Sequence, residues 1–340
     1  MNEIELQYKK YIKINIFISI TLFLIALIVS GFKINSISIL IITFPLFYNA
    51  IFTKCFKGKE HLEYTKIIVT KKEYSKKDLK TLKSAGIKVT NEEKKKNEYT
   101  YYDIDNRDVI NLIYTSRGNH DNFIRTLKFN LLMNIILTIP YIFMNIMDFP
   151  FMYHIGLAII LKLIIIIISI FIYPTLPYDT DIMSRKPKPK DMFIGREEIY
   201  LTIIQSILII FTLTIPYMFL LANGATYELV NTIFLIGFIY SILFLTIVNL
   251  SEKMFIINFI KIFTNMKLII MTICTILISI FFYFIPIFNT KEISIQNYTS
   301  TIIFVLLGTI LFDITKFARY TTVKGSKKYE RKNNKKHKWS

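Results

Sequence analysis

Eight long runs of apolar residues follow one another along this chain of 340 residues. Each run has about the 20 residues that an α-helix needs to cross a bilayer core of about 30 Å. Because unbonded backbone groups are costly in lipid, we expect these runs to be helices. The pattern predicts a mainly α, polytopic membrane protein with about eight transmembrane helices and a small α/β stub. The predicted spans are residues 12–31, 36–54, 125–146, 153–175, 198–221, 229–250, 266–286 and 299–318.

The distribution of charge gives an orientation to these spans. The net charge is +18, from 42 Lys and Arg against 24 Asp and Glu. With the amino terminus inside, only Lys33 and Lys291 lie in outward loops and Lys162 lies within a helix, which leaves 39 of the 42 on the cytoplasmic side. This is a positive-inside pattern, so we expect a multi-pass protein of the cell membrane with both termini cytoplasmic. Membrane lipid, rather than nucleic acid, is then the expected partner of the basic residues.

A polar segment, residues 56–122, separates the second span from the third and is called the stub below. Gly86 ends its predicted first helix. An order of strand, helix, strand, strand and helix suits a small, partly parallel sheet. A segment of about 65 residues buries little core alone, so we expect the stub to pack on the membrane domain or on a partner. The predicted elements are strands at 65–70, 87–90 and 99–103 and helices at 76–85 and from 108.

The linker between the fourth and fifth spans carries the most specific motif, Asp181-Ile182-Met183-Ser184-Arg185-Lys186-Pro187-Lys188-Pro189. It resembles the D-I-M-x-R-P-P-R linker of type II P-type cation-transporting ATPases, which joins their sixth and seventh membrane helices. Further landmarks of that family follow in order near residues 249–252, 285–288 and 313–316. In the stub, Asp78 to Ala85 and Ser116-Arg117 resemble the end of the family's phosphorylation domain.

The resemblance implies a division of the chain into four parts. Residues 1–55 are expected to form an amino-terminal hairpin, and residues 56–122 the remnant of a phosphorylation domain. Residues 123–320 are expected to be a six-helix membrane domain resembling the family's helices five to ten, and residues 321–340 a basic cytoplasmic tail. The hairpin either descends from the third and fourth pump helices or was acquired separately.

The residues that perform the family's catalysis are missing from this sequence. The pumps transfer a phosphoryl group to the Asp of D-K-T-G-T, and that motif does not occur here. Their Mg²⁺-binding G-D-G-x-N-D falls on residues 73–78, where Tyr74 replaces the metal-binding Asp. Phosphoryl transfer lacks its charge clamp without such carboxylates. We therefore expect no ATPase activity, no catalytic residue, no bound metal and no cofactor.

The family's membrane ion site is also replaced. Counting back from the linker motif, the liganding Asn of the sixth pump helix falls on Lys162 and its Asp on Ile166. The fifth-helix N-x-x-E falls on Asn134 and Leu137, so one amide remains and both carboxylates are lost. The Gly and Pro that unwind the sixth helix of the pumps are also replaced. We expect the run from Leu163 to Ile168 to stay helical, and no cation site of the family's kind to form.

Two intramembrane residues allow more than one interpretation. An unpaired charge at mid-bilayer costs about 2.5–3.5 kcal/mol, so Lys162 needs an explanation. It either extends along its own helix to the outer surface, acts as a tethered ammonium in a vacated cation cavity with Asn134 as partner, or takes part in proton movement. Pro45, in the second span, is either a relic of the family's broken fourth helix or an ordinary membrane-helix proline.

These features lead to several functional hypotheses. The first is a non-catalytic relative of the pumps that acts as a regulatory or stabilising subunit of a membrane transporter, with a full-length P-type ATPase as one candidate partner. The second is the membrane half of a split pump whose catalytic domains lie on another chain. The third is a passive channel or carrier, and a decaying gene product is the last.

Overall fold

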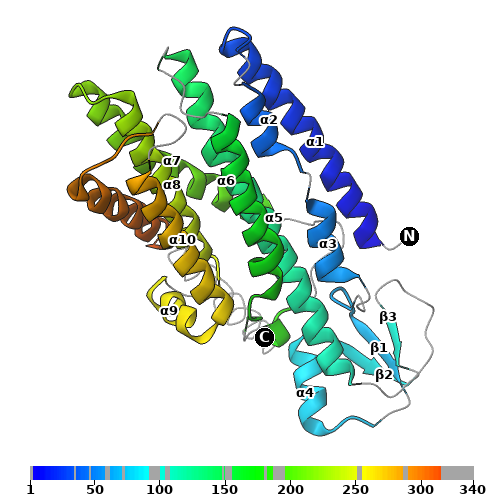
Figure 1. Cartoon of the computed structure of the whole chain (residues 1–340). Coiled ribbons are helices and arrows are strands. Elements are labelled where there is room, and N and C mark those ends of the chain that lie inside the picture. The colour runs from blue at the N-terminus through cyan, green and yellow to red at the C-terminus, as the bar shows by residue number, and fades with distance from the viewer. Residues whose placement is uncertain are drawn as a thin grey trace, which may run out of the picture. The chain divides into compact units, whose positions relative to one another are not determined.

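The structure is a computed structural model that is mainly helical and contains one small sheet (Figure 1). Among the residues that the structure describes, eight helices are long and apolar enough to cross a membrane, which confirms the predicted fold class. They span Tyr8–Val29, Ile37–Phe56, Val109–Ile146, Ile155–Thr175, Ile199–Ala222, Tyr227–Val248, Met266–Phe284 and Ile295–Ile314. The structure describes residues 3–33, 36–45, 47–57, 62–70, 73–91, 100–103, 108–147, 149, 155–179, 182–186, 196–250, 255–285 and 290–314. Asp181, Pro187, the basic tail and parts of the three later family landmarks lie outside these ranges.

The individual elements are labelled in Figure 1. The strands are β1 (Ile67–Thr70), β2 (Lys88–Thr90) and β3 (Thr100–Asp103). The α-helices are α1 (Glu3–Val29), α2 (Ile37–Thr43), α3 (Tyr48–Phe56), α4 (Lys76–Ser84), α5 (Val109–Ile146), α6 (Ile155–Ile167), α7 (Arg196–Ala222), α8 (Tyr227–Val248), α9 (Phe255–Ile260) and α10 (Met266–Phe284). Short π- or 3₁₀-helical segments occupy Ile168–Ile172, Tyr173–Thr175, Ile182–Ser184 and Lys261–Thr264.

The chain divides into two compact units. The first consists of residues 1–16, 45–128 and 166–196 and contains the stub and the linker. The second consists of residues 17–44, 129–165 and 197–340 and contains most of the apolar helices.

The sheet of the first unit is fully parallel, with strand order β2-β1-β3. Parallel neighbours require a crossover, which α4 supplies between β1 and β2. The three strands and α4 lie where the sequence predicts them, and the sheet is parallel throughout rather than in part. Its core consists of Leu62, Ile68, Leu82, Ala85, Ile87, Val109 and Ile113.

Local sequence explains both ends of α4. The side chain of Ser75 caps the first turn by accepting a hydrogen bond from the Asp78 backbone at 3.1 Å. At the other end, Gly86 has φ of +74°, and the backbone N–H of Ile87 donates to the Leu82 carbonyl at 2.9 Å. This is the Schellman arrangement, in which a glycine adopts the left-handed conformation that ends a helix. The chain can then turn directly into β2.

In the second unit, α8 is buried along its whole apolar length. Close packing depends on glycines, because a Cβ on Gly237 would lie 2.8 Å from Leu213, and one on Gly308 would lie 2.2 Å from Thr212. Gly237 belongs to α8 and Gly308 to the last span, Ile295–Ile314, while both of their neighbours belong to α7. Small residues at membrane helix contacts let the backbones approach closely.

Two of the eight spans are irregular along their length. The second span is interrupted between α2 and α3, where Phe44 has extended dihedrals and Pro45 follows it. The fourth span continues past Ile167 as a π-helix, Ile168–Ile172, and then as a 3₁₀ turn. The run from Leu163 to Ile168 is helical, as predicted, and the winding widens from an α-helix to a π-helix at Ile168. Ser169, which the sequence comparison predicts to replace the family's helix-breaking Pro, lies fully buried within the π-helix.

Candidate functional site

Lys162 is buried in the second unit and does not extend to the outer surface. Its side chain is 5% exposed, and Nζ donates a hydrogen bond to the backbone carbonyl of Ile42. Lys162 lies on α6 and Ile42 near the carboxyl end of α2. The structure thus supports the internal ammonium over the orientation along its own helix.

The interruption at Pro45 explains why the Ile42 carbonyl is available. α2 ends at Thr43, and the last four carbonyls of an α-helix have no partner within that helix. Two of these carbonyls are used by side chains from other helices: Ser19 of α1 donates to Thr43 at 2.9 Å, and Lys162 donates to Ile42. A cation at a helix carboxyl end is also favoured by the helix dipole. The break in the second span therefore forms a binding position for a cation, which Lys162 occupies.

Asn134 is not the partner of Lys162. Its Oδ1 is buried and makes no hydrogen bond, and the same holds for Oγ1 of Thr138 one turn further along α5. Consecutive membrane spans run in opposite directions, and Tyr141 of α5 donates to Ser36 just before α2 at 3.3 Å. From that contact, Ile42 and Asn134 are about 9 and 10.5 Å away along their helices at 1.5 Å per residue, which places them at similar depths.

The remaining positions predicted from the family's ion and magnesium sites are Leu137, Ile166 and Tyr74. Leu137 is fully buried on α5, and Ile166 is half-buried near the end of α6. Tyr74 packs its ring against the core of the stub. None of these three side chains offers a carboxylate ligand.

The linker residues that the structure describes dock on the stub and on α5 within the first unit. Met183 packs against the stub core, and its carbonyl accepts a hydrogen bond from Ser84 at 3.0 Å. Arg117 of α5 is 7% exposed and donates to three backbone carbonyls: Ile182 at 3.3 Å, Arg185 at 2.9 Å and Ala85 at 3.0 Å. One guanidinium thus holds together the linker, the end of α4 and α5.

An ion network reinforces this docking. Arg185 contacts Asp121 at 3.1 Å and Asp179 at 2.8 Å, and Arg125 contacts the same Asp179 oxygen at 2.7 Å. These side chains are 11–35% exposed, so solvent screens them less than it screens a surface pair. Arg185 was predictable through its motif, whereas its contact with Arg117 and the roles of both aspartates and Arg125 were not predicted. The four-residue spacing of Asp121 and Arg125 on α5 was the available signal.

Gly118 lets the ring of Tyr178, which lies just before the linker motif, pack closely against α5. A Cβ at this position would lie 2.4 Å from two atoms of the Tyr178 ring and 2.6 Å from a third. The hydroxyl of Tyr178 donates to Asn119 at 3.0 Å, and burial raises the pKa of that hydroxyl.

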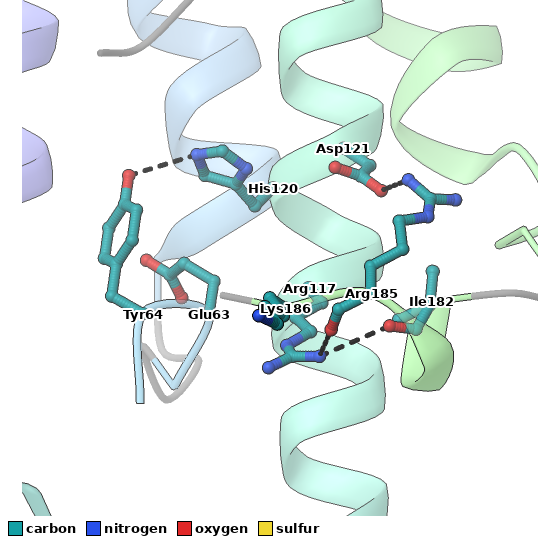
Figure 2. Close-up of a pocket in the computed structure, with 8 residues that line it drawn as sticks. All are labelled: Glu63, Tyr64, Arg117, His120, Asp121, Ile182, Arg185 and Lys186. Carbon is teal, nitrogen blue, oxygen red and sulfur yellow. Dashed lines mark hydrogen bonds and ion pairs between the residues drawn. The ribbon is translucent and has the colours of Figure 1, made fainter. Parts of the chain in front are cut away.

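A small cavity of about 40 Å³ lies within this docked region (Figure 2). A residue pair before β1 contributes to its wall, and the hydroxyl of Tyr64 lies 3.1 Å from Nε2 of His120. α5 and the linker supply the rest of the lining. The lining residues are Glu63, Tyr64, Arg117, His120, Asp121, Ile182, Arg185 and Lys186.

Comparison with known protein families identifies the class of the membrane region. Residues 157–318 match the family model described as "Cation transporting ATPase, C-terminus". The protein is therefore a multi-pass membrane protein with a C-terminal transmembrane domain of the P-type cation ATPase kind. The match begins within α6 and includes Lys162, the linker and the spans that follow. No curated protein matches the chain.

Proposed function

We propose that this protein is a non-catalytic relative of the cation-transporting ATPases that acts as a regulatory or stabilising subunit of a membrane transporter. The observation that carries the proposal is the buried ammonium of Lys162 on the Ile42 carbonyl. A transported ion has to leave its site, whereas this cation is covalently attached to α6. The apolar side chains at positions 137 and 166 provide no carboxylate to hold a second cation beside it.

The stub supports the non-catalytic part of this proposal. Tyr74 occupies the position of the family's metal-binding carboxylate, and its ring packs on the stub core. Hard cations such as Mg²⁺ need oxygen ligands, which an aromatic ring in such a position does not supply. The excess of Lys and Arg in one set of loops supports a cell-membrane protein with cytoplasmic termini.

A second candidate is the membrane half of a split pump, and the intact docking region favours it. The parallel sheet, the Arg117 contacts and the Arg185 network are well-formed structure that connects the stub with the linker. In this candidate, a partner chain supplies the phosphorylated Asp and the ion passes through the present chain. The two candidates differ in whether Lys162 affects the ion that is transported.

The first experiment is isolation of the tagged chain from its native membranes in mild detergent, with mass spectrometry of the bound proteins. An unrelated polytopic protein with the same tag is the control. We expect a stoichiometric transporter partner, and one with a D-K-T-G-T motif fits either candidate. Recovery of the chain alone contradicts both, and cation flux through liposomes that contain only this chain would then indicate a channel or carrier.

The second experiment separates the two candidates in the isolated complex. The cation dependence of ATP hydrolysis is compared between the wild-type chain and Lys162→Met, which keeps the length of the side chain and removes its charge. If the chain is a regulatory subunit, the same cations activate both complexes with the same relative affinities. A change in cation selectivity with Lys162→Met would instead place the transport path in this chain.

A further inference from the structure

The cavity beside the linker has an excess of positive charge. Two arginines and a lysine line it, Arg117, Arg185 and Lys186, against the two carboxylates of Glu63 and Asp121. Arg185 is already bonded to Asp121 at 3.1 Å, and Glu63 accepts a hydrogen bond from Ser116 at 2.5 Å. One positive charge therefore remains unbalanced among the lining residues when His120 is neutral.

Arg117 has Asp121 as an electrostatic neighbour but forms no direct ion pair with a carboxylate of the described residues. Its two terminal nitrogens donate to backbone carbonyls. Its Nε is buried and has no hydrogen-bond partner. A buried guanidinium without a directly bonded anion costs free energy, because carbonyl dipoles replace only part of its hydration. An anion in the cavity would supply a directly bonded counter-charge.

The size and the donors of the cavity define which anion fits. A cavity needs about 10–15 Å³ to hold one water. The volume of about 40 Å³ therefore holds about three waters, which is comparable to one tetrahedral oxyanion and too small for a nucleotide. Guanidinium and ammonium groups are the side chains that bind phosphate best, and Lys186 is exposed and can approach an anion in the cavity. Tyr64 and His120 add a hydroxyl and an imidazole to the wall (Figure 2).

We propose that this cavity binds a single oxyanion of the phosphate class, held by Arg117 and Lys186 against the linker. The group is either free phosphate or the phosphomonoester headgroup of a lipid. A lipid source is sterically reasonable because residues 117–121 precede the predicted apolar run of α5, which starts at residue 125, by less than three turns. Binding at this position would fasten the linker to α5 and so couple the docked region to the anion. This inference does not depend on the proposed subunit role.

The test uses the full chain purified in detergent, with thermal unfolding as the readout. Inorganic phosphate is titrated against chloride at matched ionic strength in one arm. In the other arm, phosphatidylcholine nanodiscs are compared with and without phosphatidic acid. The variants are Lys186→Gln, which removes the exposed cation of the cavity, and Lys83→Gln as the control, which makes the same charge change at an exposed position of α4 outside the lining. Arg117→Lys is a further variant, but Lys186→Gln decides the result because Arg117 also holds the linker.

We expect saturable stabilisation of the wild type and of Lys83→Gln, with affinity weakened about tenfold in Lys186→Gln through loss of one charge-assisted hydrogen bond. Stabilisation by inorganic phosphate identifies the free ion, and stabilisation by phosphatidic acid alone identifies the headgroup. Equal responses of the two lysine variants overturn the proposal, because they indicate general screening of positive charge. No response in either arm overturns it as well.

Discussion

Substitution of Gly118 by alanine tests the docked region most directly. The added Cβ would lie 2.4 Å from the Tyr178 ring, whereas ordinary contacts begin near 3.4 Å. The ring therefore has to move by about 1 Å, and in a packed interior such a shift displaces its neighbours as well. Tyr178 lies just before the linker motif, and its hydroxyl is bonded to Asn119 of α5. Displacement of the ring is therefore expected to weaken the attachment of this segment to α5.

The expected change in stability follows from two destabilising contributions and one stabilising contribution. Overpacking costs about 1–3 kcal/mol. Loss of the hydrogen bond from Tyr178 to Asn119 costs about 0.5–1.5 kcal/mol. Alanine gains about 1 kcal/mol over glycine in helix propensity. The net destabilisation of the docked region is about 2 kcal/mol, which changes its opening equilibrium by up to about thirtyfold.

The natural thiols of the chain provide the assay. Cys55 is 1% exposed and is an electrostatic neighbour of Tyr178, whereas Cys274 is exposed. In a Cys274→Ser background, the labelling rate of Cys55 by a thiol reagent reports the opening of this region. We expect Gly118→Ala to increase that rate by up to about thirtyfold under conditions where closing is faster than labelling.

A double variant supplies the control. When Tyr178→Ala removes the ring, the additional change Gly118→Ala has no clash to create, and the labelling rate is expected to stay the same or to fall. The proposed clash is refuted if Gly118→Ala leaves the labelling of Cys55 unchanged in the wild-type background. It is also refuted if the increase is equally large without the ring.

Three further predictions concern stability. Gly308→Ala is expected to lower the thermal midpoint in detergent, because its Cβ would lie 2.2 Å from Thr212, and combining it with Thr212→Ala should restore most of the loss. Lys162→Met is expected to change the free energy of unfolding by about 1 kcal/mol or less, since loss of a charged hydrogen bond is offset by relief of charge burial; Lys162→Glu, which places a carboxylate near the negative end of α2, should unfold at a clearly lower temperature. Asp179→Asn is expected to cost about 1–3 kcal/mol, measured by the labelling of Cys55, because it weakens the bonds to two partly buried arginines.

The sequence was sufficient for the elements whose physics is local. The eight spans were predictable because lipid forces every apolar run of this length to satisfy its own backbone. The order of the stub was predictable because its strands are short apolar runs and Ser75 and Gly86 mark the ends of α4.

Contacts between distant segments were not accessible in the same way. The carbonyl that binds Lys162 lies 120 residues earlier in the chain, and the contacts of Arg117 with the linker span 65 and 68 residues. The π-helix at Ile168 lies in an apolar run that only Ser169 interrupts. Nothing in the pattern of residues there distinguishes backbone bonds to the fifth preceding residue from bonds to the fourth. Hydropathy therefore gave the spans and the family motif gave the linker, while the partners of the charged residues required three-dimensional placement.

The position of Lys162 in the chain also bears on how the protein enters the membrane during synthesis. The span that carries this lysine is the most apolar of the eight, with a mean hydropathy of 3.1. Each of its many Ile and Leu residues favours insertion by about 0.3–0.6 kcal/mol, so together they outweigh a penalty of about 3 kcal/mol for one charged residue. The acceptor carbonyl belongs to the second span, which is synthesised earlier. The ammonium can therefore find its partner as soon as its own span has entered, without waiting for the four spans that follow.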